Sequence, residues 1–291
     1  IEREPIDFYK TATNQLNPFK VVIAPWLNQI THKGTRSDYR LALEHLMEHF
    51  ACVEEISHDH AATFLKQAPT YYNVAKTTVH KWQSAYINLW KYLGKDFGVW
   101  LNHSIPATPE REKPRDYWEN SEVRHLAETA RGNNKKPWLY HAINIAAHTG
   151  ARADAISKCE YLSAKQLVLF PKSKWEKRDR QIPVHLQIRD SLHYWMENRR
   201  EQNTISNAFT RLKKHQLGYP DSKVFHSFRN TFIQHLMFNN VPDHLISASV
   251  GHKVDTMTRG RYGDGQAIVA TLQDAIQSID YSKPDWDRIY I

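Results

Sequence analysis

Apolar residues recur at helical spacing through the first third of the chain. One stripe is Tyr39, Leu43, Leu46, Met47 and Phe50, and another is Val79, Trp82, Tyr86, Leu89 and Leu93. Spacings of three and four residues place such side chains on one face of a helix, which then packs toward a core. Ser37 and Thr77–Thr78 are candidate N-caps. With shorter helices expected at about 20–30 and 58–68, this part is predicted to form a small helical bundle.

The rest of the chain is predicted to be helical with one strand-like interruption. A helix starting at Pro137 is expected to end at Gly150, because proline favours the first helical position and glycine the residue after the last turn. Short β-type runs at 167–170 and 181–184 flank a polar segment and predict a hairpin. The remaining helices are expected at about 121–130, 185–199, 203–215, 226–239, 242–250 and 266–279.

Residues 103–116 separate the two patterns. This segment contains Pro106, Pro109 and Pro114 with a run of charges and almost no apolar residue, which is typical of an extended linker. We therefore expect a mainly α chain with a helical bundle over 1–105, a linker over 106–116, and a helical domain with a small antiparallel β-sheet over 117–291.

The charge is concentrated in the second domain. Of 39 Lys+Arg and 31 Asp+Glu, residues 1–110 hold 11 of each, so residues 111–291 hold 28 and 20 and carry the whole net charge of +8. This excess favours an anionic partner, although a solvated basic surface is the simpler alternative. Cys52 and Cys159 are too few for a disulfide framework. Without a membrane span or signal peptide in the sequence, a cytoplasmic protein is expected.

One apparent metal motif is rejected. His45-Leu-Met-Glu-His49 has the spacing of two zinc-binding histidines one helical turn apart. Leu46 and Met47 lie within the apolar stripe, however, and no third ligand is evident. Packing histidines in a small bundle are the better interpretation, and no metal is expected.

The predicted hairpin is strongly basic at its tip. Five cations fall within nine residues, namely Lys172, Lys174, Lys177, Arg178 and Arg180. Such a hairpin can contact nucleic-acid phosphates by displacing counterions. The alternative is a hairpin whose charges only prevent pairing between sheet edges.

The most informative residues lie further along the chain. Thr149-Gly-Ala-Arg152 follows a helix end, His226-Ser-Phe-Arg229 places two polar side chains on one helical face, and Gly251-His252 precedes Tyr262 by ten residues. Arginine forks can bind both non-bridging oxygens of a phosphodiester and stabilise its transition state. A tyrosine hydroxyl needs a base and nearby positive charge before it attacks phosphorus. A hairpin lysine can protonate the leaving oxygen.

In order and spacing, these boxes resemble the tyrosine recombinases, or phage-type integrases. The resemblance implies that Arg152 and Arg229 bind the scissile phosphate and that His252 bonds the phosphate or transition state. It implies that His226 accepts the proton of Tyr262, which forms a 3′-phosphotyrosyl link and releases a 5′-hydroxyl. Lys174 is the preferred general acid, followed by Lys172 and Lys177. Tyr281 and Tyr290 are rejected as nucleophiles because of their position relative to Gly251-His252.

The sequence departs from the family pattern at three places. Ala155 replaces the usual acid three residues after the first arginine, and Asn230 replaces the common basic residue after the second. The interval from His252 to Tyr262 is one residue longer than the commonest form. The first departure concerns local packing more than the mechanism.

The resemblance also implies partners. The first domain becomes a SAM-like core-DNA-binding bundle, in which Lys33, Arg36, Arg40, Lys76 and Lys81 are candidate DNA contacts, and the second becomes the catalytic domain. The expected partners are double-stranded DNA, three further copies in a homotetramer on two DNA sites, and optional DNA-bending proteins, with nucleoid association when bound. The amphipathic stretch 265–279 is expected to dock on a neighbouring protomer, or else to pack on its own domain.

The predicted function is therefore site-specific recombination of a mobile element, with neither ATP nor a metal cofactor. A type IB topoisomerase-like nicking and religating enzyme and a DNA-binding protein with a degenerate site are the alternatives. The target sequence, the direction of recombination, the presence of an arm-binding domain before Ile1, and cleavage in cis or in trans stay open at this stage.

Overall fold

The computed structural model describes residues 18–52, 55, 58–93, 116–172, 179–252 and 272–284. The chain divides into two compact units, Ile1–Glu112 and Lys113–Ile291. The division falls within the proline-rich segment, and each unit is described by itself. In these parts of the chain no helix is long and apolar enough to cross a membrane.

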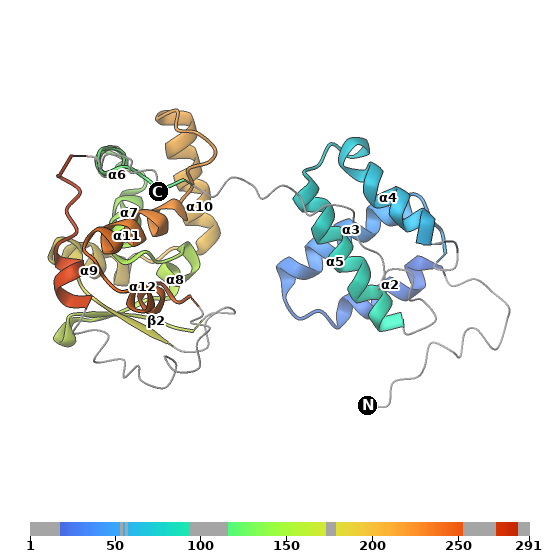
Figure 1. The fold of residues 1–291 in the computed structure, drawn as a ribbon, viewed down its shortest axis with the longest axis horizontal. Helices are drawn as coiled ribbons and strands as arrows, with labels where there is room; N and C mark the ends of the chain where they lie inside the picture. The colour runs from blue at the N-terminus through green and yellow to red at the C-terminus, as the bar shows by residue number, and fades with distance from the viewer. Residues whose placement is uncertain are drawn as a thin grey trace. The chain divides into compact units, whose positions relative to one another are not determined.

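The described part of the first unit is a bundle of four helices, drawn in blue to teal in Figure 1. They are α2 (Phe19–Asn28), α3 (Lys33–Met47), α4 (His58–Tyr71) and α5 (Lys76–Leu93). The two predicted stripes supply much of its core, where Leu43, Leu46, Tyr86, Leu89 and Trp90 are wholly buried. The start of α3 was predicted wrongly, because the His32 imidazole accepts from Thr35 N and caps the helix five residues before Ser37.

The second unit is mainly helical. Its labelled helices are α6 (Asn120–Arg131), α7 (Pro137–Thr149), α8 (Ala153–Lys158), α9 (Arg189–Glu197), α10 (Gln202–Arg211), α11 (Ser227–Phe238) and α12 (Asp243–Val250), and residues 272–277 are also helical. The predicted boundaries of α7 are confirmed, with proline in the first turn and Gly150 in the left-handed conformation at φ 60°. A π-helical turn, Leu212–Gln216, extends α10.

A three-stranded antiparallel sheet interrupts these helices. Strands β2 (Leu167–Phe170) and β3 (Arg180–Pro183) form the predicted hairpin, with Phe170 opposite Arg180 at the end nearest its tip. The third strand, β1 (Glu160–Leu162), was not predicted, because three residues are too few to show an alternating pattern. It pairs with β2, so β2 is the central strand.

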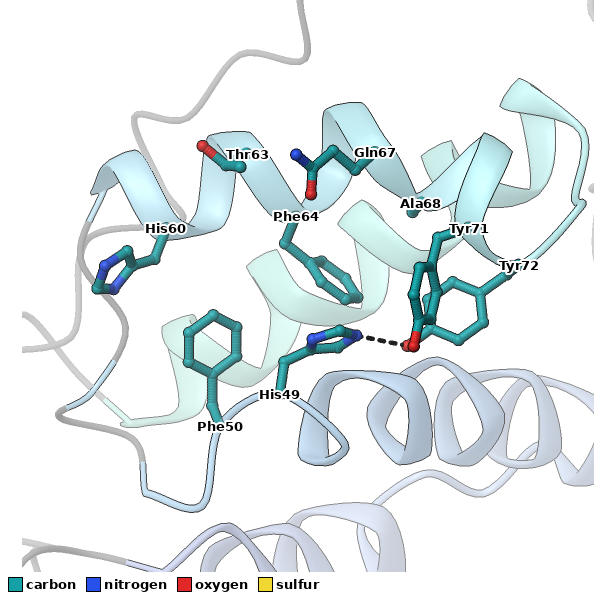
Figure 2. Close-up of a pocket in the computed structure, with 9 residues that line it drawn as sticks. All are labelled: His49, Phe50, His60, Thr63, Phe64, Gln67, Ala68, Tyr71 and Tyr72. Carbon is teal, nitrogen blue, oxygen red and sulfur yellow. Dashed lines mark hydrogen bonds between the residues drawn. The ribbon is translucent and has the colours of Figure 1, made fainter.

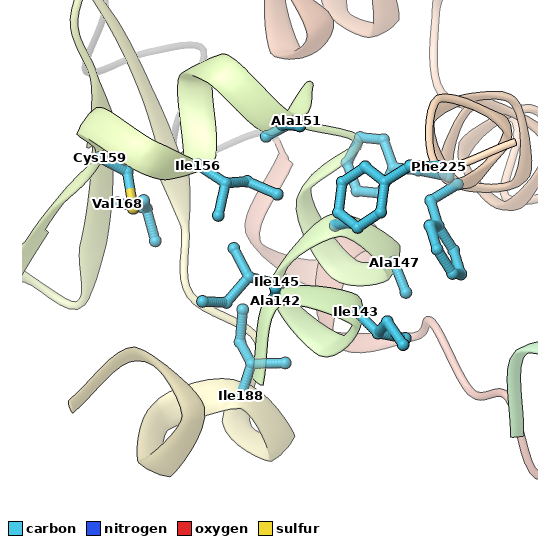
Figure 3. Packing of buried hydrophobic residues seen from close by; sticks show 14 of the residues in the cluster. Ala142, Ile143, Ile145, Ala147, Ala151, Ile156, Cys159, Val168, Ile188 and Phe225 are labelled. Carbon is cyan, nitrogen blue, oxygen red and sulfur yellow. The ribbon is translucent and has the colours of Figure 1, made fainter. Parts of the chain in front are cut away.

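The core of the second unit is built around α7. Figure 3 shows Ala142, Ile143, Ile145 and Ala147 of α7 among side chains of other elements, including Ile156 of α8, Val168 of β2 and Ile188. Large buried aliphatic side chains each contribute ~1.5–3 kcal/mol to folding. Since α7 ends at Gly150, this packing fixes the position of the first arginine box.

The C-terminal segment, residues 272–284, packs on its own unit. Leu272, Ile276 and Ile279 are at most 1% exposed within the single chain and belong to the main core. The Tyr281 hydroxyl donates to Ala147 O over 2.6 Å. The expectation that this apolar face docks on a neighbouring protomer is therefore wrong for the described residues, because the chain covers it with its own core.

Candidate active site

Arg229 is the structural centre of the site. It lies in the first turn of α11 and is 1% exposed, yet it is an arginine. Its guanidinium donates to Gly150 O over 3.2 Å and to Val250 O. These carbonyls lie at the C-terminal ends of α7 and α12, where backbone oxygens lack partners within the helix and favour a cation. One side chain therefore joins three elements.

Two glycines make this arrangement possible. Gly150 and Gly251 end α7 and α12 in the left-handed conformation, with φ of 60° and 71°. At Gly150 a Cβ atom would lie 2.6 Å from Cδ1 of Phe232 on α11. Glycine is therefore required there both for its backbone angles and for the close approach of α7 to α11.

The first arginine box supplies the second cation of the site. Arg152 is the N-cap residue of α8 with extended backbone angles, and it is half-buried. The usual family acid is absent, and Ala155 packs against the core in its place. Arg152 thus follows directly from the turn at Gly150, whose carbonyl Arg229 contacts.

His252 lies within the field of three arginines. It follows Gly251, and its backbone N–H donates to Ser247 O over 2.8 Å. Partial desolvation lowers the pKa of His252, and the charges of Arg229, Arg152 and Arg180 lower it further. We call Arg152, Arg180 and Arg229 the arginine cluster. Desolvation and the charges of this cluster both favour the neutral form of the His252 imidazole.

His226 lies immediately before α11 and is half-buried. Its carbonyl accepts from Arg229 N over 3.0 Å. The structure thus places His226 and Arg229 in one helical turn, as the H-x-x-R spacing predicts.

Two buried lysines, neither of them predicted from the sequence as a functional or buried residue, fix the loop before His226. Lys213 Nζ donates to Pro220 O over 2.8 Å and to Lys223 O over 2.6 Å. Lys223 Nζ lies 2.5 Å from Glu122 Oε2 of α6. Lysines are rarely buried unless they are paired, so these contacts mark a loop whose conformation is fixed.

Of the hairpin cations, the structure describes Lys172 and Arg180. Lys172 is exposed, and its backbone N–H donates to Asp179 Oδ1 over 2.8 Å. Lys174, Lys177 and Arg178 lie outside the described residues, as does Tyr262.

Arg180, expected with the hairpin cations as a DNA contact, is only 6% exposed, and its Nη1 donates to Ser249 O over 2.5 Å. Its location corrects the expectation of an exposed side chain. The strand period could have indicated this, because Arg180 shares a face with the buried Ile182.

The candidate DNA contacts of the first unit lie on α3 and α5. Lys33, Arg40, Lys76 and Lys81 are exposed. Arg36 differs, because its Nε and Nη2 donate to Ile30 O over 2.8 and 2.5 Å and fix the turn between α2 and α3.

The rejected zinc motif forms part of an aromatic pocket. Figure 2 shows His49 facing Tyr72, with a 2.9 Å hydrogen bond between His49 Nε2 and the Tyr72 hydroxyl, beside Phe50 and Phe64. The His45 ring packs 4.6 Å from that of Trp82. No group of three His, Cys, Asp or Glu suited to a metal occurs among the residues that the structure describes.

Comparison with known proteins identifies the family. The model of the phage integrase family matches residues 117–267, just over half of the chain. The chain therefore belongs to the phage integrase family, and it is a site-specific DNA recombinase of the tyrosine type. No curated protein sequence gave a significant match.

Solved structures have the same fold. A lambda integrase tetramer bound to a Holliday junction has a TM-score of 0.65 and 18% identity, covering 90% of this chain and 84% of that one. A lambda integrase dimer bound to a COC' core site has a TM-score of 0.66 and 15% identity, covering 100% and 85%. The Tn1549 transposon integrase (aa 82-397), in complex with circular intermediate DNA, has a TM-score of 0.61 and 14% identity, covering 85% and 95%.

Proposed function

We propose that this recombinase binds one phosphodiester of duplex DNA through Arg152 and Arg229, and that the hydroxyl of Tyr262 attacks the phosphorus and replaces the 5′-oxygen. The observation that carries the proposal is the position of Arg229, buried between the ends of α7 and α12 with Arg152 and His252 beside it. A site held rigid before the substrate arrives can stabilise developing negative charge without reorganising during the reaction.

The proposed roles follow from the chemistry of each group. Arg152 and Arg229 bind the non-bridging oxygens, and His252 donates a hydrogen bond to one of them. The Tyr262 oxygen attacks phosphorus while His226 takes its proton, and the bond from phosphorus to the 5′-oxygen breaks. Lys174 donates a proton to that oxygen, with Lys172 and Lys177 as the alternatives. The reverse sequence, with a different 5′-hydroxyl, joins the new strand.

The proposed partners are double-stranded DNA and other copies of this chain. The net charge of +8 suits a polyanion. The similar lambda integrase is a tetramer on a Holliday junction, and the similar Tn1549 integrase is in complex with circular intermediate DNA. We therefore propose four protomers acting on two duplexes of a mobile element.

Covalent trapping tests this function. The substrate is a duplex from the ends of the element with a nick just downstream of the cleaved phosphate. Cleavage releases the short fragment between that phosphate and the nick. This fragment carries the 5′-hydroxyl, so its loss prevents rejoining. We expect the wild-type protein to form a DNA adduct on a denaturing gel in the presence of a chelator, and Tyr262→Phe to form none.

Tyr281→Phe is the matched control. Burial raises the pKa of Tyr281, and its hydroxyl already donates to Ala147 O, so this variant is expected to retain the adduct. Specific binding without an adduct on any such duplex would favour the DNA-binding protein with a degenerate site. An adduct without assembly on two sites would favour the topoisomerase-like enzyme.

A further inference from the structure

Arg180 begins β3 and faces Phe170 across the base of the hairpin. Its guanidinium carbon lies 4.4 Å from the centre of the Phe170 ring, and the residue is 6% exposed. A planar guanidinium stacks well on an aromatic face, which a lysine does not reproduce. The side chain is thus held from one side by the hairpin itself.

The other side of Arg180 is attached to α12. Its Nη1 donates to Ser249 O over 2.5 Å, while Arg229 donates to the next carbonyl, Val250 O. These carbonyls belong to the last turn of α12, and Gly251 and His252 follow directly. Cations at a helix C-terminus satisfy carbonyls that lack a partner within the helix, and in a buried environment these charge-assisted bonds are strong.

We propose that Arg180 is a positioning residue that couples the base of the hairpin to His252. This inference rests on the proposed function, in which the hairpin supplies the general acid and His252 contacts the phosphate. Arg180 acts through the end of α12 and does not touch DNA. Because one side chain contacts both Phe170 and Ser249 O, it fixes the base of the hairpin relative to the end of α12 that carries His252.

The location of Arg180 distinguishes it from the other hairpin cations. Lys172 is exposed and available to a phosphate, whereas Arg180 is enclosed by Phe170 and α12. Its charge also acts on His252, together with the charges of Arg152 and Arg229. A substitution at Arg180 therefore changes His252 in a way that the loss of a surface phosphate contact does not.

The first experiment measures the pKa of His252 in the full chain without DNA. Histidine ring signals are followed by NMR against pH in wild-type protein and Arg180→Gln, and the His252 signal is assigned as the one missing from His252→Gln. Removing the nearby cation is expected to raise the pKa of His252 toward its ordinary value of about 6.5. Arg131→Gln is the control, since Arg131 also stacks on a ring, that of Tyr140, but is exposed. It is expected to leave the titration unchanged.

The second experiment separates positioning from DNA binding. Single-turnover adduct formation is measured on the nicked duplex at saturating protein, and Kd is measured on the intact duplex. For Arg180→Gln we expect a rate about 10- to 100-fold lower, because small misplacements of catalytic groups have effects of this size, and a Kd within about threefold of wild type. The rate of Arg180→Lys is expected to lie between those of wild type and Arg180→Gln. The rate and Kd of Arg131→Gln are expected to match wild type.

An unchanged His252 titration in Arg180→Gln overturns the proposal. So does a Kd weakened tenfold or more with an unchanged rate at saturation, since that describes a phosphate contact. If Arg180→Gln does not fold, Phe170→Leu replaces it, because it keeps the cation and removes the ring. A reduced rate with unchanged Kd then supports the proposal, and an unchanged rate overturns it. If wild-type protein forms no adduct, the proposed function fails, while the DNA-free titration still decides the coupling.

Discussion

The two units of the chain differ in the burial of their polar side chains. Among the described residues, every buried polar or charged side chain belongs to the second unit, including the four cations Arg180, Lys213, Lys223 and Arg229. In the first unit the described cations lie at the surface or, like Arg36, are half-buried. The described core of the first unit is thus aromatic and aliphatic, and polar contacts such as that of Arg36 with Ile30 O lie outside it.

This difference fits the different tasks that we propose for the two units. Burying a cation is unfavourable unless carbonyls or a carboxylate compensate it, so each buried cation of the second unit fixes the elements that it contacts. Such rigidity suits a site that must hold one phosphate in one geometry. A surface that follows a DNA backbone needs only exposed charge, because counterion release does not require exact placement.

Acidification should affect the second unit most. His148, His185 and His235 are 4% exposed and lie around the C-terminal segment, and burial lowers the pKa of His148 to about 3 and of His235 to about 4. Their pKa values in the unfolded chain are about 6.5. The unfolded state therefore binds more protons between pH 6.5 and 4, and the free energy of unfolding falls as the pH falls through that range.

The expected slope is up to about 1.4 kcal/mol per pH unit for each such histidine. Urea unfolding at pH 7, 6 and 5 measures it, with His148→Gln/His235→Gln as the comparison, which should show a shallower slope. A free energy of unfolding that does not change between pH 7 and 5 would disprove the neutral, buried assignment.

Breaking the Glu122–Lys223 pair should have the next largest effect. The side chains are 19% and 7% exposed. Glu122→Ala leaves the lysine charge without its carboxylate, and such losses cost about 3–5 kcal/mol. We expect urea unfolding to show a free energy of unfolding reduced by about 3 kcal/mol, the lower end of this range. Glu122→Ala/Lys223→Met should recover part of it, and failure of the double variant to recover any stability would mean that the charge is not the cause.

Gly150→Ala tests the close approach of α7 and α11. Gly218 is a matched control, because it has φ of 69° but nothing within 4 Å of a Cβ atom, whereas Gly150 has Phe232 at 2.6 Å. Both substitutions incur backbone strain, but only the first adds a steric clash of about 1–3 kcal/mol. Equal losses of stability in the two variants would contradict the packing described.

Substitution of surface cations in the first unit should have the smallest effect on stability. Arg40→Ala, Lys76→Ala and Lys81→Ala should each change the free energy of unfolding by less than about 0.5 kcal/mol. If they contact phosphates, each lowers the salt dependence of DNA binding by about one unit of slope. Arg36→Ala should instead cost about 1 kcal/mol, because Ile30 O loses its donor. If the salt dependence of DNA binding is unchanged in these three variants, Arg40, Lys76 and Lys81 do not contact DNA phosphates.

The sequence predicted elements with strong local signals and missed those set by tertiary contacts. The helix from Pro137 to Gly150 carries its own start and stop residues. The family boxes predicted Arg152, Arg229 and His252 as site residues, and the structure places these three residues near one another. By contrast, Ser37 resembles an N-cap but lies inside α3, because His32 caps the helix earlier.

Local sequence patterns also do not predict cations whose burial is compensated by carbonyls or a carboxylate of distant segments. Lys213 and Lys223 are buried only because they meet a loop carbonyl or Glu122 of α6, and Arg180 only because α12 ends beside β3. Charge counts assign such residues to the surface. Strand alternation gave the one usable signal, for Arg180.

The central claim is that Arg152 and Arg229 neutralise the scissile phosphate during the reaction, and a neutral substrate tests it most directly. Arg152 is suited to substitution, because it is half-buried at the start of α8. Single-turnover adduct formation by wild-type protein and Arg152→Ala is compared on a phosphodiester and on a methylphosphonate at the same position. We predict a loss of at least about 100-fold for Arg152→Ala on the phosphodiester and a much smaller loss on the methylphosphonate, which lacks the charge that arginine neutralises. An equal loss on both substrates would contradict the account.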